Sequence, residues 1–107
     1  MHHGDVIWAE FGSPSGRRPA LILTRESGLP FLTAVTVAPL TTTARSSPTW
    51  VEIDASEGIP RRSFVNLDNI QTLYLHQLGG HISTLSPAAM QKVARAINFA
   101  LGLDLIR

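Results

Sequence analysis

Gly16-Arg17-Arg18-Pro19-Ala20-Leu21-Ile22-Leu23 places two guanidinium groups directly before an apolar run. A short apolar run bounded by glycine and proline predicts a buried strand, here over residues 20–24. Pro19 fixes its own φ and favours extended backbone at Arg18, so the arginines are predicted to lie at the mouth of a loop, where the strand begins. Arginine offers a planar fork of donors that suits phosphate or carboxylate, although paired surface arginines are equally typical of a solvated loop.

The rest of the chain shows short strand patterns with turn residues between them. The turn-rich residues 12–16 join the strand at residues 20–24 to an earlier one, as in a hairpin. The segments with strand patterns are 6–11, 20–24, 31–38, 49–54, 63–67 and 70–76, with a stub around Ile82. Alternation is clearest in residues 49–54, where Val51 and Ile53 share one face and Glu52 and Asp54 share the other. This pattern predicts a strand with one buried face and one face exposed to solvent.

A helix is predicted after these strands. Ser86 suits the N-cap, Pro87 is tolerated in the first turn, and Gly102 suits the end of the helix. The apolar residues with helical spacing are Met90, Val93, Ile97 and Leu101. The predicted class is mainly β with a C-terminal helix, as a curled antiparallel sheet or small barrel that forms one domain over residues 1–107.

Composition limits the classes of function. A chain of 107 residues with 44% hydrophobic residues can bury a modest core. No apolar run approaches the ~20 residues of a membrane span, and no secretory signal is visible, so the prediction is a cytoplasmic protein with no membrane association. The chain has no cysteine, which excludes disulfides and thiolate chemistry. Net charge is +1, but six of the nine Lys and Arg residues fall within residues 17–62, which allows a local basic face.

Most familiar catalytic patterns are missing. His2, His3, His76 and His81 have no metal-ligand spacing beyond the adjacent first pair, so no metal or other cofactor is predicted. His76 and His81 flank Gly79-Gly80 and fit either an acid/base pair or ordinary surface histidines. Glu52 and Asp54 likewise fit either a carboxylate pair or a solvated strand face. No phosphate-binding glycine loop or nucleophile elbow is present.

Several segments, in order and spacing, resemble the MazF/PemK family of toxins. They are Gly4-Asp5-Val6-Ile7-Trp8, Arg18-Pro19 before an apolar strand, Val37-Ala38-Pro39-Leu40-Thr41-Thr42, Trp50-Val51-Glu52-Ile53, Ser63-Phe64-Val65-Asn66-Leu67-Asp68-Asn69-Ile70-Gln71-Thr72 and the last helix. The resemblance covers nearly the whole chain. It implies an SH3-like small barrel of the type shared with the CcdB toxins, assembled as a homodimer. It also implies an endoribonuclease that cleaves single-stranded RNA and is neutralised by a cognate antitoxin.

The resemblance also implies roles for single residues. The arginine and threonine that serve the reacting phosphate in the family fall on Arg18 and Thr41, and Arg17 would strengthen the local potential. In such a reaction the ribose 2′-OH attacks the adjacent phosphorus without a metal ion, leaving a 2′,3′-cyclic phosphate and a 5′-hydroxyl. Thr42, Thr43 and Asn69 are the further predicted RNA-binding residues.

Some features depart from the family pattern and keep other functions open. Residues 12–16 are shorter than the first loop of many relatives, and Thr43 and Asn69 stand where relatives often have glutamine, so the cleavage sequence and RNA class are not inherited.

A CcdB-like gyrase poison is an alternative, although the chain ends Asp104-Leu105-Ile106-Arg107 and lacks the Trp-Gly-Ile ending associated with that activity. A catalytically inactive RNA-binding relative is another. An SH3-like peptide-binding module would need an aromatic groove, for which a single tyrosine, Tyr74, is a poor basis.

Overall fold

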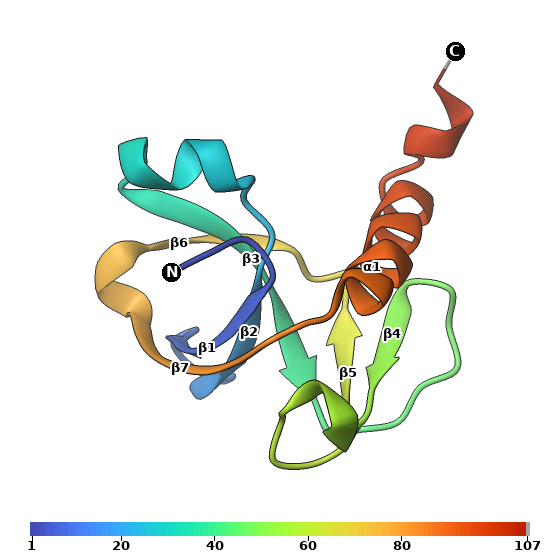
Figure 1. Ribbon diagram of the computed structural model, residues 1–107, viewed down its shortest axis with the longest axis horizontal. Helices are drawn as coiled ribbons and strands as arrows, with labels where there is room; N and C mark the ends of the chain where they lie inside the picture. Colours follow the sequence, from blue (N-terminus) through green and yellow to red (C-terminus); the bar gives the residue numbers. More distant parts are fainter. Residues whose placement is uncertain (107) are drawn as a thin grey trace.

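The computed structural model describes residues 1–106, which form a curled antiparallel sheet packed by one α-helix (Figure 1). The strands are β1 (Asp5–Glu10), β2 (Arg17–Ile22), β3 (Ala34–Thr41), β4 (Trp50–Ile53), β5 (Ser63–Asn66), β6 (Gln71–Tyr74) and β7 (Leu78–Thr84). The helix is α1 (Pro87–Ala100), and short 3₁₀ helices are η1 (Glu26–Phe31), η2 (Ala55–Glu57), η3 (Leu75–Gln77) and η4 (Leu103–Leu105). Strand order is β4-β5-β3-β2-β1-β7, with β6 paired to the first half of β3. The predicted fold class is confirmed. In residues 1–106, no helix combines the length and apolar character that a bilayer span requires.

Strand β2 begins earlier than predicted. Arg17 lies opposite Glu10, Arg18 opposite Ala9 and Pro19 opposite Trp8 in the ladder with β1. The two arginines therefore belong to the strand and not to the mouth of the loop. Pairing with β1 extends the strand through the proline, a tertiary effect that the local pattern does not contain.

Alternation along β1, β2 and β3 divides their side chains between two hydrophobic clusters. The first cluster, on the face covered by α1, includes Val6, Leu21, Ala38, Leu40, Ala89, Val93 and Ala96. The second cluster, inside the curl of the sheet, includes Ile7, Ala9, Ala20, Ile22, Val35, Val37 and Leu73. Because both faces of these strands are buried, their sequences read as continuous apolar runs.

Strand β3 differs from the predicted strand at residues 31–38 at both ends. Phe31 belongs to η1 and is 85% exposed, and the strand continues through Pro39 to Thr41. On one edge β3 pairs with β6 up to Val37 and with β5 from Leu40. Pro39 falls between these two partners, where its missing N–H interrupts neither ladder.

The region after residue 70 also departs from the prediction. Strand β6 ends at Tyr74, and residues 75–77 form η3 instead of continuing the strand to His76. The predicted stub around Ile82 is a full strand, β7, which runs through Gly79 and Gly80 and pairs with β1 with register shifts. A Cβ at Gly79 would lie 3.4 Å from the Trp8 Cβ, so this glycine allows the two strands to approach closely.

Helix α1 follows the sequence prediction at its start. The Ser86 hydroxyl accepts a hydrogen bond from the Ala89 N–H at 3.1 Å, and Pro87 occupies the first turn. The buried stripe is centred on Ala89, Val93 and Ala96, whereas Leu101, predicted to be part of the stripe, is 58% exposed at the C-cap. The alternating strand β4 is confirmed, with Val51 and Ile53 buried and Glu52 exposed.

Candidate active site

Strands β2 and β3 bring Arg18 and Thr41 to the same face of the sheet. In their ladder Ala20 lies opposite Pro39. Side chains alternate along a strand, so Arg18 shares the face of Ala20, and Thr41 shares the face of Pro39. The ladder of β2 with β3 ends at this pair, and Arg18 and Thr41 lie two residues beyond it on these two neighbouring strands.

Arg18 is half-buried and only partly hydrogen-bonded. Its Nη2 donates to the Ser15 carbonyl at 3.3 Å, whereas its Nε is buried and has no hydrogen-bond partner. Among residues 1–106, no carboxylate forms an ion pair with Arg17 or Arg18. A buried donor without a partner costs about 1–3 kcal/mol, so this Nε is a candidate donor to a bound anion.

The Thr41 hydroxyl is held by the loop that follows β3. Its Oγ1 accepts a hydrogen bond from the Thr43 N–H at 3.2 Å. A hydroxyl that accepts from the backbone still has its own proton to donate. Thr43 is therefore tied to the site through its backbone, while Thr41 keeps a donor for a ligand oxygen.

A cavity of about 420 Å³ adjoins the end of β3. Its lining is largely apolar and consists of Trp8, Pro19, Leu40, Thr41, Thr42, Ile59, Pro60, Arg61, Ser63 and Ile82. Arg17 leaves the face of β2 opposite to Arg18, and its guanidinium carbon lies 4.6 Å from the centre of the Trp8 ring. The structure thus brings Thr41, Thr42 and Trp8 together at the cavity, whereas neither Arg17 nor Arg18 is among its lining residues. Asn69 is exposed in the turn after β5 and likewise does not line the cavity.

Arg61 lines this cavity and was missed by the sequence prediction. It lies in the connection between β4 and β5, far from Arg17 and Thr41 along the chain. Its only sequence signal was the Arg61-Arg62 pair, which repeats the arrangement at Arg17-Arg18. The dipeptide does not reveal which of its two arginines faces a cavity, because that depends on how the connection folds.

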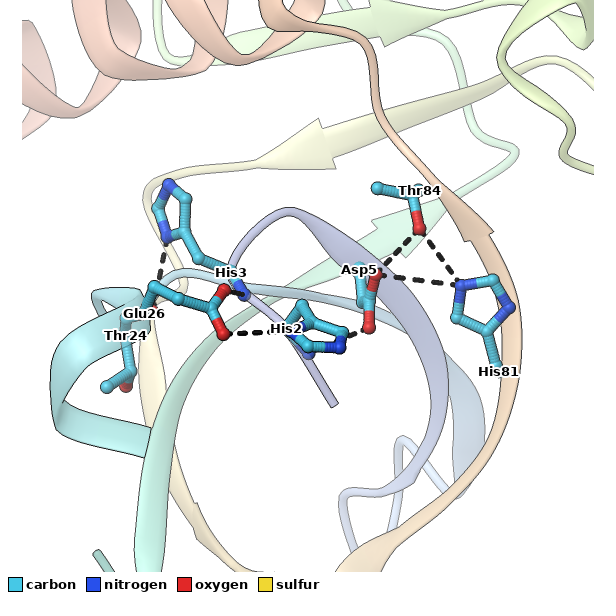
Figure 2. A network of polar contacts seen from close by, with 7 residues as sticks. All are labelled: His2, His3, Asp5, Thr24, Glu26, His81 and Thr84. Carbon is cyan, nitrogen blue, oxygen red and sulfur yellow. Dashed lines mark hydrogen bonds and ion pairs between the residues drawn. The ribbon is translucent and has the colours of Figure 1, made fainter. Parts of the chain in front are cut away.

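His81 belongs to a separate polar group that also contains His2, Asp5 and Thr84, here called the histidine network (Figure 2). The buried Asp5 carboxylate accepts from the Thr84 hydroxyl at 2.7 Å and from the His2 N–H at 2.8 Å, and the His81 Nε2 lies 3.6 Å away. Burial alone would raise the pKa of Asp5, but the two hydrogen bonds and the electrostatic effect of the nearby His81 and His2 together lower it below its ordinary value.

The other candidate catalytic groups are engaged locally. His76 stacks on Tyr74 with ring centroids 5.9 Å apart, whereas His81 contacts Thr84, so the two histidines do not form a pair. Glu52 forms an ion pair with Arg62 at 2.9 Å. Hydrogen bonds from the Ser56 hydroxyl and N–H lower the pKa of Asp54. In the part of the chain that the structure describes, no three His, Asp or Glu side chains are grouped as a metal ion would require.

Comparisons with known proteins agree on one family. The family model described as "PemK-like, MazF-like toxin of type II toxin-antitoxin system" matches residues 2–101. The chain is 47% identical over 87 residues to endoribonuclease MazF3 of Mycobacterium tuberculosis, which covers 81% of this chain and 84% of that protein. Its fold is similar to the M. tuberculosis toxin MazF-mt6, with 41% identity and a TM-score of 0.84 over 92% of this chain and 96% of the other.

A second solved structure adds a partner to the comparison. It is an endoribonuclease in complex with its cognate antitoxin from a mycobacterial species, 35% identical to this chain, with a TM-score of 0.87 and 96% of both chains covered. The family model spans nearly all of the chain, and the sheet, the helix, Arg18 and Thr41 lie within the matched residues. The chain therefore belongs to the family of PemK-like, MazF-like toxins of type II toxin–antitoxin systems.

Proposed function

We propose that this protein is the endoribonuclease toxin of a type II toxin–antitoxin pair and acts in the cytoplasm on single-stranded RNA. Family membership supports the class of activity, because the relative named above is an endoribonuclease. The chemistry is assigned to Arg18 and Thr41, with no metal ion taking part. The substrate's own 2′-OH is the nucleophile, so the protein has to position one phosphate and stabilise its charge.

In this mechanism Arg18 stabilises the charge that develops on the phosphoryl oxygens. Attack of the 2′ oxygen on phosphorus forms the 2′,3′-cyclic phosphate and breaks the bond from phosphorus to the 5′ oxygen, and the 2′-OH proton passes to solvent water. The 5′ oxygen takes up a proton for which Arg18 is the proposed donor, and water returns a proton to the guanidine. The Thr41 hydroxyl donates to a phosphoryl oxygen and fixes its orientation. Arg17, Thr42 and Thr43 bind the neighbouring RNA, with Asn69 as a more distant contact.

One observation supports this proposal: the Arg18 Nε is buried without a hydrogen-bond partner, and the neighbouring strand carries the Thr41 hydroxyl, which has a proton to donate. The test is incubation of the purified protein with a defined RNA in EDTA, followed by end-group analysis of the fragments. The expected ends are a 2′,3′-cyclic phosphate and a 5′-hydroxyl. Intact RNA, or fragments with 5′-phosphate ends, would contradict the proposal.

The proposal includes a homodimer. Large apolar side chains are exposed near the end of α1 and just after it, with Phe99 at 56%, Leu101 at 58% and Leu105 at 78%. Such a cluster on a small chain supports self-association, because it would be covered in a dimer. Equilibrium sedimentation at micromolar concentration is expected to show dimers, and a purely monomeric distribution would contradict this part of the proposal.

The proposed partner is an antitoxin with an acidic segment that folds on the toxin. A flexible acidic chain can wrap a large surface and place carboxylates against Arg17 and Arg18, where phosphates would otherwise bind. The similar endoribonuclease solved with its cognate antitoxin supports this assignment. Expression of the toxin alone is expected to stop growth, and co-expression with the neighbouring antitoxin gene is expected to restore it.

A further inference from the structure

The cavity beside Thr41 is lined by one arginine, Arg61, from the β4–β5 connection. A second arginine, Arg17, lies over the ring of Trp8, which is another lining residue. Among residues 1–106, Arg61 has neither an ion pair nor a side-chain hydrogen bond. Its neighbour Arg62 is paired with Glu52 at 2.9 Å and lies over the Phe64 ring. Arg62 is thus held in an ion pair, whereas Arg61 has free hydrogen-bond donors beside the cavity.

The wall that carries Arg61 is held in place at several points. The Glu57 carboxylate accepts the Ser86 N–H at 2.7 Å and the Ser86 hydroxyl at 2.9 Å, which ties the β4–β5 connection to the start of α1. Ile59 is buried in the first hydrophobic cluster, and the Ser63 hydroxyl donates to the Arg61 carbonyl at 3.0 Å. The backbone at Arg61 is therefore fixed before a ligand arrives, which lowers the entropic cost of binding.

The lining of the cavity suits a flat, uncharged ring that carries hydrogen-bond acceptors. The apolar side chains of Trp8, Ile59 and Ile82 surround it, and both an indole ring and a guanidinium plane can stack on a nucleobase. The polar groups are hydroxyls and one guanidinium, with no acidic side chain in the lining. Since arginine only donates hydrogen bonds, the wall at Arg61 favours acceptor atoms on the ring edge.

We infer that the cavity binds one unstacked nucleobase of the RNA next to the phosphate that Thr41 contacts, and that Arg61 determines which base is accepted there. This inference rests on the proposed function. Guanine and uracil present a carbonyl oxygen, O6 or O4, where adenine and cytosine present an amino group. Arg61 donates to that carbonyl and cannot accept from the amino group. The cavity therefore selects keto bases over amino bases at a single position of the substrate.

The test uses short RNAs in which each position around the cleavage site carries each of the four bases in turn. At one position, kcat/KM is expected to be roughly 5- to 150-fold higher for guanine or uracil than for adenine or cytosine. Arg61→Gln, which can both donate and accept, is expected to remove most of this preference at that position and leave the other positions unchanged. Arg62→Gln is the matched control and should keep the wild-type preference.

Three results would overturn the inference. The first is an equal loss of kcat/KM for all four bases in Arg61→Gln, which would make Arg61 a general phosphate contact. The second is the same loss of preference in Arg62→Gln. The third is unchanged RNA kinetics in Arg61→Gln together with weaker antitoxin binding, which would assign the cavity to a side chain of that protein.

A binding measurement separates failure of this inference from failure of the proposed function. RNAs with a 2′-deoxy substitution at the cleaved nucleotide cannot react, and their binding can be followed by the fluorescence of Trp8 in a Trp50→Phe background, since the chain has two tryptophans. The keto preference is expected to appear in Kd and to be lost in Arg61→Gln. If the wild-type protein cleaves no RNA but shows this preference, only the catalytic proposal fails. Equal Kd values for all four bases at every position would overturn the inference itself.

Discussion

The arginines around the cavity and the histidine network on β1 and β7 differ in how their charges are balanced. The buried Asp5 carboxylate accepts hydrogen bonds from the Thr84 hydroxyl and the His2 backbone N–H, and the His81 Nε2 lies 3.6 Å from it. Arg18, in contrast, has a buried Nε without any partner. A buried polar group with hydrogen-bond partners in its own chain indicates a structural role, whereas a buried donor without a partner is a candidate for binding a ligand.

The largest effect is expected at Arg18. Arg18→Ala should lower single-turnover cleavage by about 10²- to 10³-fold or more, because loss of a preorganised donor at developing charge typically costs that much. Arg18→Lys should recover little of the rate, since a point charge does not reproduce the planar fork. The measurement is the cleavage rate of one RNA at saturating enzyme.

His76→Ala and His81→Ala are the controls for this comparison and should keep most of the activity. The His81 ring contacts Thr84, and the His76 ring stacks on Tyr74. If the histidine variants were inactive while Arg18→Ala still cleaved RNA, the roles assigned to the two regions would have to be exchanged.

Asp5 should affect stability and leave the chemistry of the folded protein intact. Asp5→Ala removes the acceptor for the Thr84 hydroxyl and the His2 backbone N–H, and a hydrogen bond to a charged group contributes about 1.5–3 kcal/mol. The free energy of unfolding in urea should fall by this amount, with Asp5→Asn closer to the wild type. Cleavage per folded molecule should not change. A stable but inactive Asp5→Ala variant would show that the network takes part in catalysis.

The free energy of unfolding at acid pH should depend on the same carboxylate, that of Asp5. Burial alone would raise the pKa of Asp5, but its hydrogen bonds and the nearby histidines hold it below the ordinary value. Because the pKa of Asp5 is lower in the folded state than in the unfolded state, its carboxylate contributes to the free energy of unfolding. This contribution is fully present above the unfolded-state pKa of about 3.9 and is lost as pH falls through the folded-state pKa. Unfolding free energy should therefore decrease below about pH 4 in the wild type, and less steeply in Asp5→Asn.

Thr41 should show a smaller effect than Arg18. Thr41→Val keeps the shape but removes both the acceptor for the Thr43 N–H and the proposed donor to the phosphate. A neutral hydrogen bond contributes about 0.5–1.5 kcal/mol, so the rate should fall roughly 2- to 10-fold. The affinity for a non-cleavable RNA should change little. A loss confined to affinity would instead make Thr41 a binding residue.

The sequence predicts the elements that depend on local signals. The start of α1 follows from the Ser86 cap and the proline after it, and both lie where expected. The alternation of apolar and polar residues correctly predicts that β4 has one buried face and one face exposed to solvent. The sequence predicts only a short strand around Ile82 in place of β7, because Gly79 and Gly80 are poor strand formers. In the structure β7 pairs with β1, and Gly79 allows it to approach Trp8 closely. That pairing is made by residues distant in sequence, so no local pattern contains it.

The residues of the candidate site could likewise be predicted only in part from the sequence. Arg18 and Thr41 came from a resemblance to a family, and the β2–β3 register supports their placement on one face. Arg61 was missed because its position depends on the hydrogen bonds between Glu57 and Ser86, which fold the β4–β5 connection toward the cavity. Asn69 was predicted as an RNA contact but lies in a turn outside the cavity lining.

The smallest effect is expected at Arg62. Its Nε lies 2.9 Å from the Glu52 Oε2, but the two side chains are 60% and 50% exposed, and exposed ion pairs contribute at most about 1 kcal/mol. Arg62→Gln should therefore change the free energy of unfolding in urea by less than Asp5→Ala does, and the difference should shrink further in high salt, which screens exposed charges. A loss as large as that of Asp5→Ala would show that Arg62 is a structural residue of the same importance as the buried carboxylate.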